Sequence, residues 1–281
     1  MPSTREQSPA ERRKAWIARS FDLASDSYDE ANGPFFNPVG ERLVDLAGLR
    51  PGDRVLDVGC GRGAVLFAAV AAVGPDGYVA GVDLSPAMVR RTAAQAAGAG
   101  LRNVSVRVGD AEDPGFPDGS FEAVLSSFSL VLTPDPAAAL ARARRLLAPD
   151  GRFGTTSFGP DPEPAWREAV RVLRDFADPE AAGAYARPFN ALADDPEGML
   201  AAAGFAGVRT VEGTTATEFA DLDAWWRSAW ADGHRGVLET IPPDRREEAR
   251  RAACAVVAPL AGSDGRLVRR TAVRWTIARR G

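Results

Sequence analysis

The chain has 281 residues, 45% of them hydrophobic and 26% charged, with 34 basic and 38 acidic side chains and a formal net charge of −4. This composition excludes a disordered, collagen-like or disulfide-stapled chain, and the charge balance argues against a globally basic nucleic-acid-binding or membrane-surface protein. The two cysteines lie far apart and there is one histidine, so we expect no zinc, iron–sulfur or other metal site.

The first 50 residues have helical patterns. Residues 8–25 predict a largely polar helix, the sequence Asn32-Gly33-Pro34 predicts a break, and residues 37–49 predict a second helix. A Pro-Gly-Asp turn at residues 51–53 then separates this helical segment from a region with a different pattern.

Residues 54–158 alternate between strand and helix patterns. Strands are predicted at 54–58, 78–82, 104–108, 121–126 and 152–158, with helices at 64–73, 87–97 and 136–147. This alternation indicates βαβ units and therefore an α/β fold with a doubly wound, mostly parallel sheet. Such sheets bind ligands at the carboxyl ends of their strands, so the loops after Val58, Val82, Val108 and Ser126 are the first places to search.

The remainder of the chain is less regular. It predicts helices at 166–176, 196–203, 222–231 and 243–258, and strands at 208–213 and 266–278. We expect the helical stretches on either side of the sixth strand to cap the ligand-binding edge of the sheet, with a separate interaction domain as the alternative.

A glycine-rich loop, VLDVGCGRGA at residues 55–64, follows the first strand and opens a helix. Gly59, Gly61 and Gly63 allow a tight turn and let backbone amides approach a ligand. Asp83 follows 20 residues after Gly63, where a carboxylate can accept hydrogen bonds from a ribose diol; the alternative is an aspartate at a helix entry. The same glycines also fit a dinucleotide fingerprint, so NAD or FAD is a rival ligand.

A second acidic candidate follows the third strand in the sequence GDAED. Asp110 is placed to accept a hydrogen bond from an exocyclic amine such as that of adenine, and Ala111 offers its backbone amide. The alternative is an ordinary loop aspartate.

Four motifs in order, DVGCGRG, GVDLSPAM, GDAEDPGFPDGSFEAVLSS and LLAPDGRF, resemble class I S-adenosylmethionine-dependent methyltransferases. They look most like the UbiE-like branch, which includes many small-molecule and natural-product enzymes. The resemblance covers residues 54–158 and implies S-adenosyl-L-methionine as cofactor and a seven-stranded sheet whose last strand is antiparallel. We therefore expect an N-terminal helical lid (1–50), a Rossmann-like cofactor-binding core (51–158), and a remainder (159–281) with helical cap insertions at 159–207 and 221–265.

The resemblance also implies roles for residues at the methionine end of the cofactor. Asp57, Gly59 and Gly61 are expected to surround the methionine moiety, and Ser126 is expected to lie near its amine.

At the nucleoside end, the resemblance assigns the ribose hydroxyls to Asp83, with Leu84 and Met88 packing near the adenine. It assigns the adenine amine to Asp110 and the pocket lining to Ala111.

Aromatic side chains of the N-terminal segment, Phe21, Tyr28 and Phe36, are expected to close over the cofactor; the alternative is that they only cover the sheet. Phe36 and Phe128 are predicted to line the acceptor pocket, and Tyr28 is a candidate catalytic residue.

The sequence has one histidine, His234, which is the residue type used most often as a general base. The cofactor's methyl group is already electrophilic, so the enzyme has to align an acceptor lone pair, and a base is needed for a hydroxyl or ammonium acceptor. Trp226 and Trp230 share a helix face just before His234, which suggests an aromatic wall with His234 as base. The alternative is a helix packed on the sheet with a surface histidine. Ser127-Phe128-Ser129 stands where some relatives carry histidines, so we expect no base there.

The predicted function is methyl transfer to O, N or C of a small, largely apolar or aromatic metabolite, with oxygen slightly favoured. An NAD(P)-dependent oxidoreductase and a non-methylating S-adenosylmethionine-binding cyclase or binding module are the alternatives. The longest apolar run is about half of what a bilayer requires and the N-terminus has no apolar signal core. We therefore expect a cytoplasmic protein without nucleic-acid or membrane partners, and the sequence leaves a homodimer open.

Overall fold

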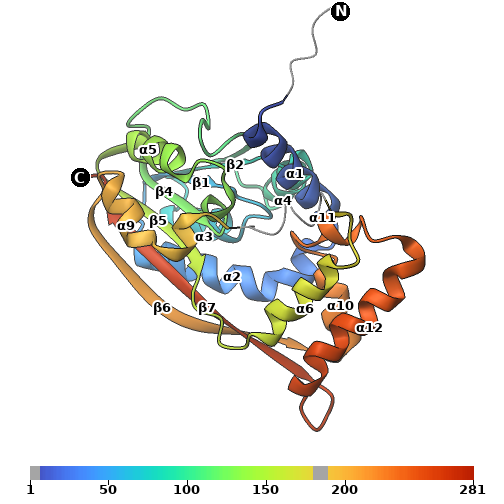
Figure 1. The fold of residues 1–281 in the computed structure, drawn as a ribbon. Helices are drawn as coiled ribbons and strands as arrows, with labels where there is room; N and C mark the ends of the chain where they lie inside the picture. The colour runs from blue at the N-terminus through green and yellow to red at the C-terminus, as the bar shows by residue number, and fades with distance from the viewer. Residues whose placement is uncertain (1–6, 180–188) are drawn as a thin grey trace, which may run out of the picture.

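The computed structural model describes residues 7–179 and 189–281. In this part of the chain, seven strands form one sheet in the order β3-β2-β1-β4-β5-β7-β6 (Figure 1). The strands are β1 (Arg54–Val58), β2 (Tyr78–Asp83), β3 (Val104–Val108), β4 (Phe121–Ser127), β5 (Leu147–Phe158), β6 (Ala206–Phe219) and β7 (Leu267–Arg279). Strands β1 to β5 pair in parallel, and β7 is antiparallel to both β5 and β6. The predicted α/β sheet is therefore confirmed, including its antiparallel last strand.

Helices cover both faces of the sheet. Helices α2 (Tyr28–Ala47) and α3 (Ala64–Val73) form an apolar layer on one face, while α5 (Pro136–Leu146), α8 (Ala191–Asp194) and α9 (Pro196–Ala202) form one on the other. Helix α4 (Pro86–Gly98) packs on β2 and β3, and α1 (Pro9–Ala24) lies across α4 (Figure 1). The remaining short helices are η1 (Leu130–Leu132), α11 (Arg235–Leu238), η2 (Pro243–Arg245) and η3 (Ala258–Leu260).

Local side-chain chemistry sets the start of several helices. Ser8 and Glu11 form a reciprocal capping box at the start of α1. At the start of α4, the Ser85 hydroxyl accepts a hydrogen bond from the Met88 amide at 3.1 Å, and Pro86 takes the first helical position. The chain therefore enters α4 directly after β2 ends at Asp83, as the Ser85-Pro86 pair predicts.

The predicted break at Asn32-Gly33-Pro34 is wrong, because α2 runs through these residues and holds both Pro34 and Pro38 inside it. Each proline removes one backbone hydrogen bond, which normally disfavours a helix interior. The apolar residues after Pro34 pack into the core against β1 and α3, as in the fully buried Val39 and Leu43. This tertiary packing overrides the local propensity.

The sixth strand has 14 residues, more than twice the predicted length, chiefly because the prediction stopped at Gly213. That glycine lies inside β6, and a Cβ atom there would stand 3.1 Å from the Trp275 ring of β7. Gly213 thus makes room for the tryptophan and does not end the strand. The alternating threonines that follow continue β6 to Phe219.

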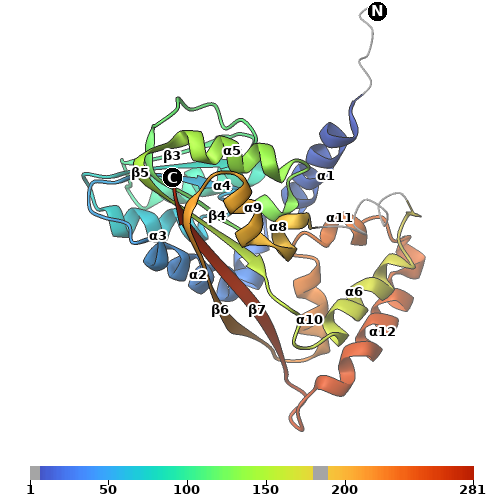
Figure 2. The ribbon, with the colours of Figure 1, turned by 60° about the vertical axis from the view of Figure 1, so that its left-hand side comes forward.

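A third apolar core lies at the far end of the β6–β7 hairpin. Helices α6 (Ala165–Arg174), α10 (Leu222–Ala229) and α12 (Arg246–Val257) pack there around Trp166 and Trp225, beyond the sheet (Figures 1 and 2). These helices come from both predicted insertions. From the second insertion, α11 returns to pack on α1. The division into a lid, a core and cap insertions stays a prediction.

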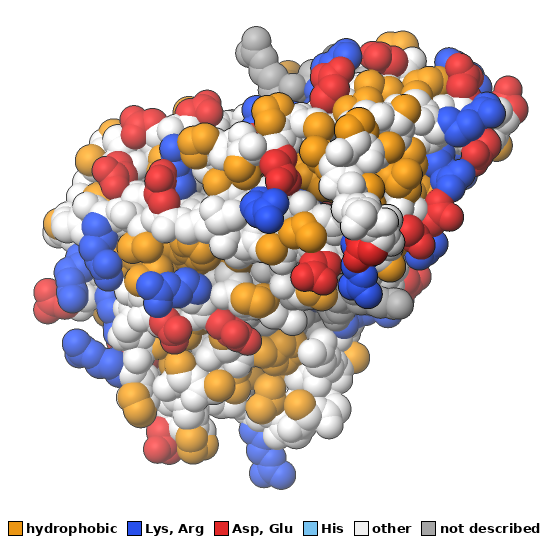
Figure 3. Space-filling model, turned by 90° about the horizontal axis from the view of Figure 1, so that it is seen from below, with side chains coloured by type: hydrophobic (Ala, Val, Ile, Leu, Met, Phe, Trp, Pro, Cys, Tyr) orange, Lys and Arg blue, Asp and Glu red, His pale blue; other side chains and the backbone are white. Residues whose placement is uncertain are grey.

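The surface seen from below carries Arg, Asp and Glu side chains interspersed with hydrophobic ones, so neither charge sign dominates this face (Figure 3). In the described ranges, no helix combines the length and apolar character needed to cross a bilayer.

Candidate functional site

A cavity of about 220 Å³ opens at the carboxyl ends of the central parallel strands. Its wall is built by the loops after β1, β2, β3 and β4, by α1 and the start of α2, and by a short segment before α11. This is the edge at which the sheet topology predicts a ligand. Eight of the nine predicted cofactor residues line it: Asp57, Gly59, Gly61, Asp83, Leu84, Met88, Asp110 and Ala111.

The glycine loop is held open toward the cavity. Gly61 has φ +48°, and a Cβ atom built on it would meet nothing within 4 Å, so its backbone borders open space. The amides of Gly59 and Cys60 donate to the Val82 carbonyl at 2.8 and 3.0 Å, which ties the loop to the end of β2. The loop therefore presents backbone to a ligand in the way that the glycine spacing indicates.

Asp83 joins the glycine loop to the start of α4. Its Oδ2 accepts from the Gly61 amide and its Oδ1 accepts from the Ser85 amide, both at 2.8 Å. Burial raises the pKa of Asp83, and these two hydrogen bonds oppose the rise. A carboxylate has about four lone-pair sites, so the fixed side chain retains capacity for ribose hydroxyls.

Asp57 is a buried carboxyl on the cavity wall with an unsatisfied oxygen. Its side chain is 1% exposed, and Oδ2 has no hydrogen-bond partner among the described residues. Burial, with the charge of Asp83, raises the pKa of Asp57 to about 8. Burying a carboxyl oxygen without a hydrogen-bond partner costs folding free energy, unless a bound ligand supplies the partner. A cationic group bound beside the glycine loop would do so, and the methionine end of S-adenosylmethionine carries such groups.

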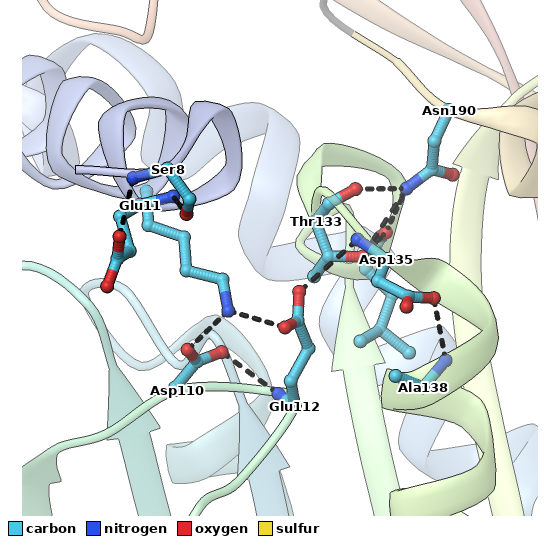
Figure 4. Close-up of polar contacts among 10 residues, drawn as sticks. Ser8, Glu11, Asp110, Glu112, Thr133, Asp135, Ala138 and Asn190 are labelled. Atoms are coloured by element: carbon cyan, nitrogen blue, oxygen red, sulfur yellow. Dashed lines mark hydrogen bonds and ion pairs between the residues drawn. The ribbon is translucent and has the colours of Figure 1, made fainter. Parts of the chain in front are cut away.

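Asp110 lies in a polar network under α1 (Figure 4). Its Oδ2 accepts from Lys14 Nζ at 2.7 Å and its Oδ1 accepts from the Glu112 amide at 2.9 Å. The sequence did not predict the lysine contact, because residues 14 and 110 are brought together only by the fold.

Ser126 differs from the other predicted cofactor residues, because it does not line the cavity. Its buried hydroxyl lies 2.6 Å from the Ser129 hydroxyl, which donates to the Val58 carbonyl at 2.6 Å. The wall at the end of β4 is formed by Ser127, Phe128 and Ser129 instead. Phe128 has φ +55°, a strained value for a non-glycine residue, and its amide donates to the buried Thr156 hydroxyl at 3.0 Å.

Aromatic side chains line the cavity beyond the glycine loop. Phe36 and Phe128, predicted from the sequence, are 5.7 Å apart between ring centroids, and Tyr28 stacks on Phe36 at 5.5 Å. The sequence reading missed Phe158, 4.4 Å from Phe128, and Phe189, 5.2 Å from Phe158. Phe158 ends β5, so the strand-end rule that selected the other loops could have found it.

The predicted tryptophan wall is wrong, since neither Trp226 nor Trp230 is among the described residues that line the cavity. The two rings pack edge to face at 5.8 Å, and the Arg246 guanidinium lies over Trp230 at 5.1 Å. Both are partly buried and pack against the third core, which the buried residues of α6, α10 and α12 form.

His234 does lie on the cavity wall, together with Asp232. Asp232 Oδ1 accepts from the His234 backbone amide at 2.8 Å and lies 2.6 Å from His234 Nδ1. One carboxylate oxygen therefore fixes both the backbone and the ring of the histidine. The sequence reading named His234 but missed Asp232.

Comparison with known proteins agrees with this geometry. Residues 55–151 match the family described as a methyltransferase domain. The chain is 46% identical over 244 residues to nocamycin O-methyltransferase of Saccharothrix syringae, covering 80% of this chain and 85% of that protein. It is 46% identical over 144 residues to aklanonic acid methyltransferase DauC of Streptomyces sp. strain C5, covering 51% and 66%.

Among solved structures, the YcgJ protein of Bacillus subtilis superposes with a TM-score of 0.60 at 22% identity, covering 86% of this chain and 98% of that one. That likeness concerns the fold alone. The match over most of the nocamycin enzyme's length decides the family: the chain belongs to the S-adenosylmethionine-dependent methyltransferases, and S-adenosylmethionine is its cofactor.

Proposed function

We propose that this chain transfers the methyl group of S-adenosylmethionine to an oxygen atom of a small, largely apolar or aromatic metabolite. The observation that carries the proposal is one continuous cavity in which the cofactor motifs and an aromatic cluster face the same space. The 46% identity to a protein named an O-methyltransferase supports oxygen over nitrogen or carbon.

The nucleoside lies across the ends of β1, β2 and β3 in this proposal. Asp83 holds the ribose hydroxyls, Leu84 and Met88 pack near the adenine, and Asp110 and Ala111 border its amine. At the other end, Asp57 and the glycine loop face the positively charged methionine moiety. The sulfur then points toward Phe128, at the boundary between the two halves of the cavity.

The acceptor occupies the aromatic half. Phe36, Phe128, Phe158 and Phe189 offer ring faces and edges to a flat apolar molecule, and Tyr28 adds a hydroxyl group. Phe189 is 40% exposed, so this half opens to solvent and gives the acceptor a way in.

The bound cofactor supplies an electrophilic methyl group, and the chain has to align the acceptor oxygen with it and remove a proton. We assign His234 as the base that accepts the proton of the acceptor hydroxyl. Asp232 holds its Nδ1, so Nε2 is the nitrogen that receives the proton. Tyr28 is the second candidate for contact with the acceptor hydroxyl.

Membership of the methyltransferase family disfavours the NAD(P)-dependent oxidoreductase and the non-methylating cyclase or binding module. The UbiE-like branch, the homodimer, the lack of nucleic-acid partners and the cytoplasmic location stay predictions from the sequence.

A methylation assay tests the proposal. The protein is incubated with S-adenosylmethionine and a panel of phenols, enols and carboxylic acids, and products are analysed by mass spectrometry. We expect a product heavier by one CH2 unit, with equimolar S-adenosylhomocysteine. Cofactor binding with no product from any acceptor would overturn the proposal.

Replacing the histidine tests the assignment of the base. For a hydroxyl acceptor, His234→Gln is expected to lower kcat by about 10²–10⁴-fold while leaving the Kd for S-adenosylhomocysteine unchanged. Trp230→Phe, near in sequence but outside the cavity wall, serves as the control. A wild-type kcat in the His234 variant would show that the histidine is not the base. The proposal of methyl transfer would still stand.

A further inference from the structure

Lys14 makes the contact that joins α1 to the loop after β3. Its ammonium lies 2.7 Å from Asp110 Oδ2 and 2.5 Å from Glu112 Oε2, and its side chain is 19% exposed (Figure 4). The two carboxylates are themselves largely covered, at 31% and 21% exposed. This is therefore a semi-enclosed triad of one cation and two anions, in which ion pairing is screened less than at a free surface.

The acidic side of the triad is anchored to the core. The Glu112 amide donates to Asp110, and Glu112 Oε1 accepts from the Asp135 amide at 3.2 Å. Asp135 in turn caps α5 by accepting from the Ala138 amide at 2.9 Å (Figure 4). The two carboxylates that bind Lys14 are therefore held by the protein core. Because they are fixed, their contact with Lys14 sets the position of α1.

Helix α1 forms one wall of the cofactor cavity. Lys14 and Asp110 both line it, as do Ile17 and Phe21 from the same helix. The carboxylate that Lys14 holds is thus the one assigned to the adenine amine.

The last turn of α1 is bonded to the loop that carries the ribose carboxylate. Asp22 Oδ1 accepts from the Ser85 hydroxyl at 2.6 Å and from the Ala87 amide at 2.9 Å. Ser85 donates its own amide to Asp83. Two positions of α1, eight residues apart, are therefore bonded to the two acidic loops that border the nucleoside half of the cavity.

The residue type fits this task. Lys14 is the only lysine of the chain, and the other 33 of its 34 basic residues are arginines. An ammonium is a compact charge with three rotatable donors, so one group can serve two carboxylates that approach from different directions.

We propose that Lys14 is a positioning residue for the cofactor, which orients Asp110 toward the adenine and seats α1 over the bound nucleoside. The inference rests on the proposed placement of the nucleoside. Without the ammonium, Asp110 and Glu112 repel one another and the loop separates from α1. The nucleoside then loses both a fixed hydrogen-bond acceptor and the wall that covers it.

Because Lys14 is the only lysine of the chain, acetylation of the peptide that contains it reports on this contact. The protein is treated with an acetylating N-hydroxysuccinimide ester, and acetylation of Lys14 is followed by peptide mass spectrometry with and without saturating S-adenosylhomocysteine. We expect the ligand to slow acetylation at least about tenfold. Glu112→Gln is expected to speed acetylation in the ligand-free protein. Glu168→Gln, a matched loss of charge at a solvent-exposed side chain of α6, is expected to leave the rate unchanged.

Binding measured by calorimetry on the same samples separates two kinds of failure. If S-adenosylhomocysteine binds and acetylation is not slowed, the role of Lys14 is overturned and the proposed function stands. If S-adenosylhomocysteine does not bind the wild-type protein, both the proposed function and the role of Lys14 are overturned.

Substitution of the lysine gives a second measurement. Lys14→Met is expected to raise the Kd for S-adenosylhomocysteine about tenfold, with Lys14→Arg recovering part of the loss. A purely structural role would lower Tm in Lys14→Met and leave the Kd of the folded fraction at the wild-type value, which would overturn the proposal. Should Lys14→Met not fold, acetylation of Glu112→Gln still decides the question.

Discussion

Asp57 is a residue whose acid–base chemistry is strongly changed by burial. Its buried carboxyl has a pKa of about 8, so it holds a proton at neutral pH in the ligand-free protein. A cationic ligand beside it favours the ionised form and expels that proton. The affinity for S-adenosylmethionine is thus expected to rise with pH, by up to about tenfold per pH unit, until pH reaches about 8. Above that pH it is expected to level off.

Calorimetric titration with S-adenosylmethionine between about pH 6 and pH 9 measures this dependence, and buffers of different ionisation enthalpy count the released protons. The ligand's own amine also titrates in this range. Asp57→Asn is the control. Its side chain has nearly the same shape but does not titrate, so any pH dependence that remains comes from the ligand's amine. A variant with the wild-type pH dependence would show that Asp57 is not the group involved.

At the scale of residues, the sequence predicted what depends on local motifs. Asp57, Asp83 and Asp110 lie at or just after the carboxyl ends of β1, β2 and β3, in the order of the motifs, and all three line the cavity. Lys14 and Asp232 could not be found in this way, because their partners are set by tertiary packing or by a short turn that carries no motif.

At the scale of elements, Gly213 of β6 leaves the space that the Trp275 ring of β7 occupies. A side chain there meets the Trp275 ring, so Gly213→Val is expected to destabilise the protein by about 1–3 kcal/mol through overpacking. Thermal or urea denaturation measures the loss. Thr214→Val, at the next and exposed position of β6, serves as the control with little change.

Equal stability of these two valine variants would contradict the role given to Gly213. The position also explains why the predicted strand is too short: an isolated glycine in a strand pattern predicts its end, whereas here it makes room for the Trp275 ring. The error at Asn32-Gly33-Pro34 has the same origin, because turn residues were weighed without the buried contacts that hold α2 together.

At the scale of the whole molecule, residues 7–179 and 189–281 form three apolar cores, two against the sheet and one among α6, α10 and α12. Trp166 lies in the third core and is 2% exposed. Trp166→Ala is expected to lower the free energy of unfolding by about 3–5 kcal/mol. The Kd for S-adenosylhomocysteine is expected to stay unchanged, because no residue of α6 lines the described cavity.

Denaturation together with calorimetry checks both halves of this expectation. A large loss of affinity in the folded variant would show that the third core supports the cofactor half of the cavity. Regular strand patterns predicted the parallel part of the sheet, and the resemblance to methyltransferases implied the full seven-stranded plan that the structure has. It did not predict that Trp226 and Trp230 belong to the third core, because helical spacing alone does not tell which neighbour an aromatic face meets.

The central claim is that one cavity holds the nucleoside against Asp83 and directs its sulfur toward the aromatic half. A crystal structure of the protein with S-adenosylhomocysteine tests it most directly. We expect the ribose hydroxyls within hydrogen-bond distance of Asp83, the adenine beside Asp110, and the sulfur facing Phe128. A nucleoside bound elsewhere, or an Asp83 carboxylate that makes no contact with the ribose, would contradict it.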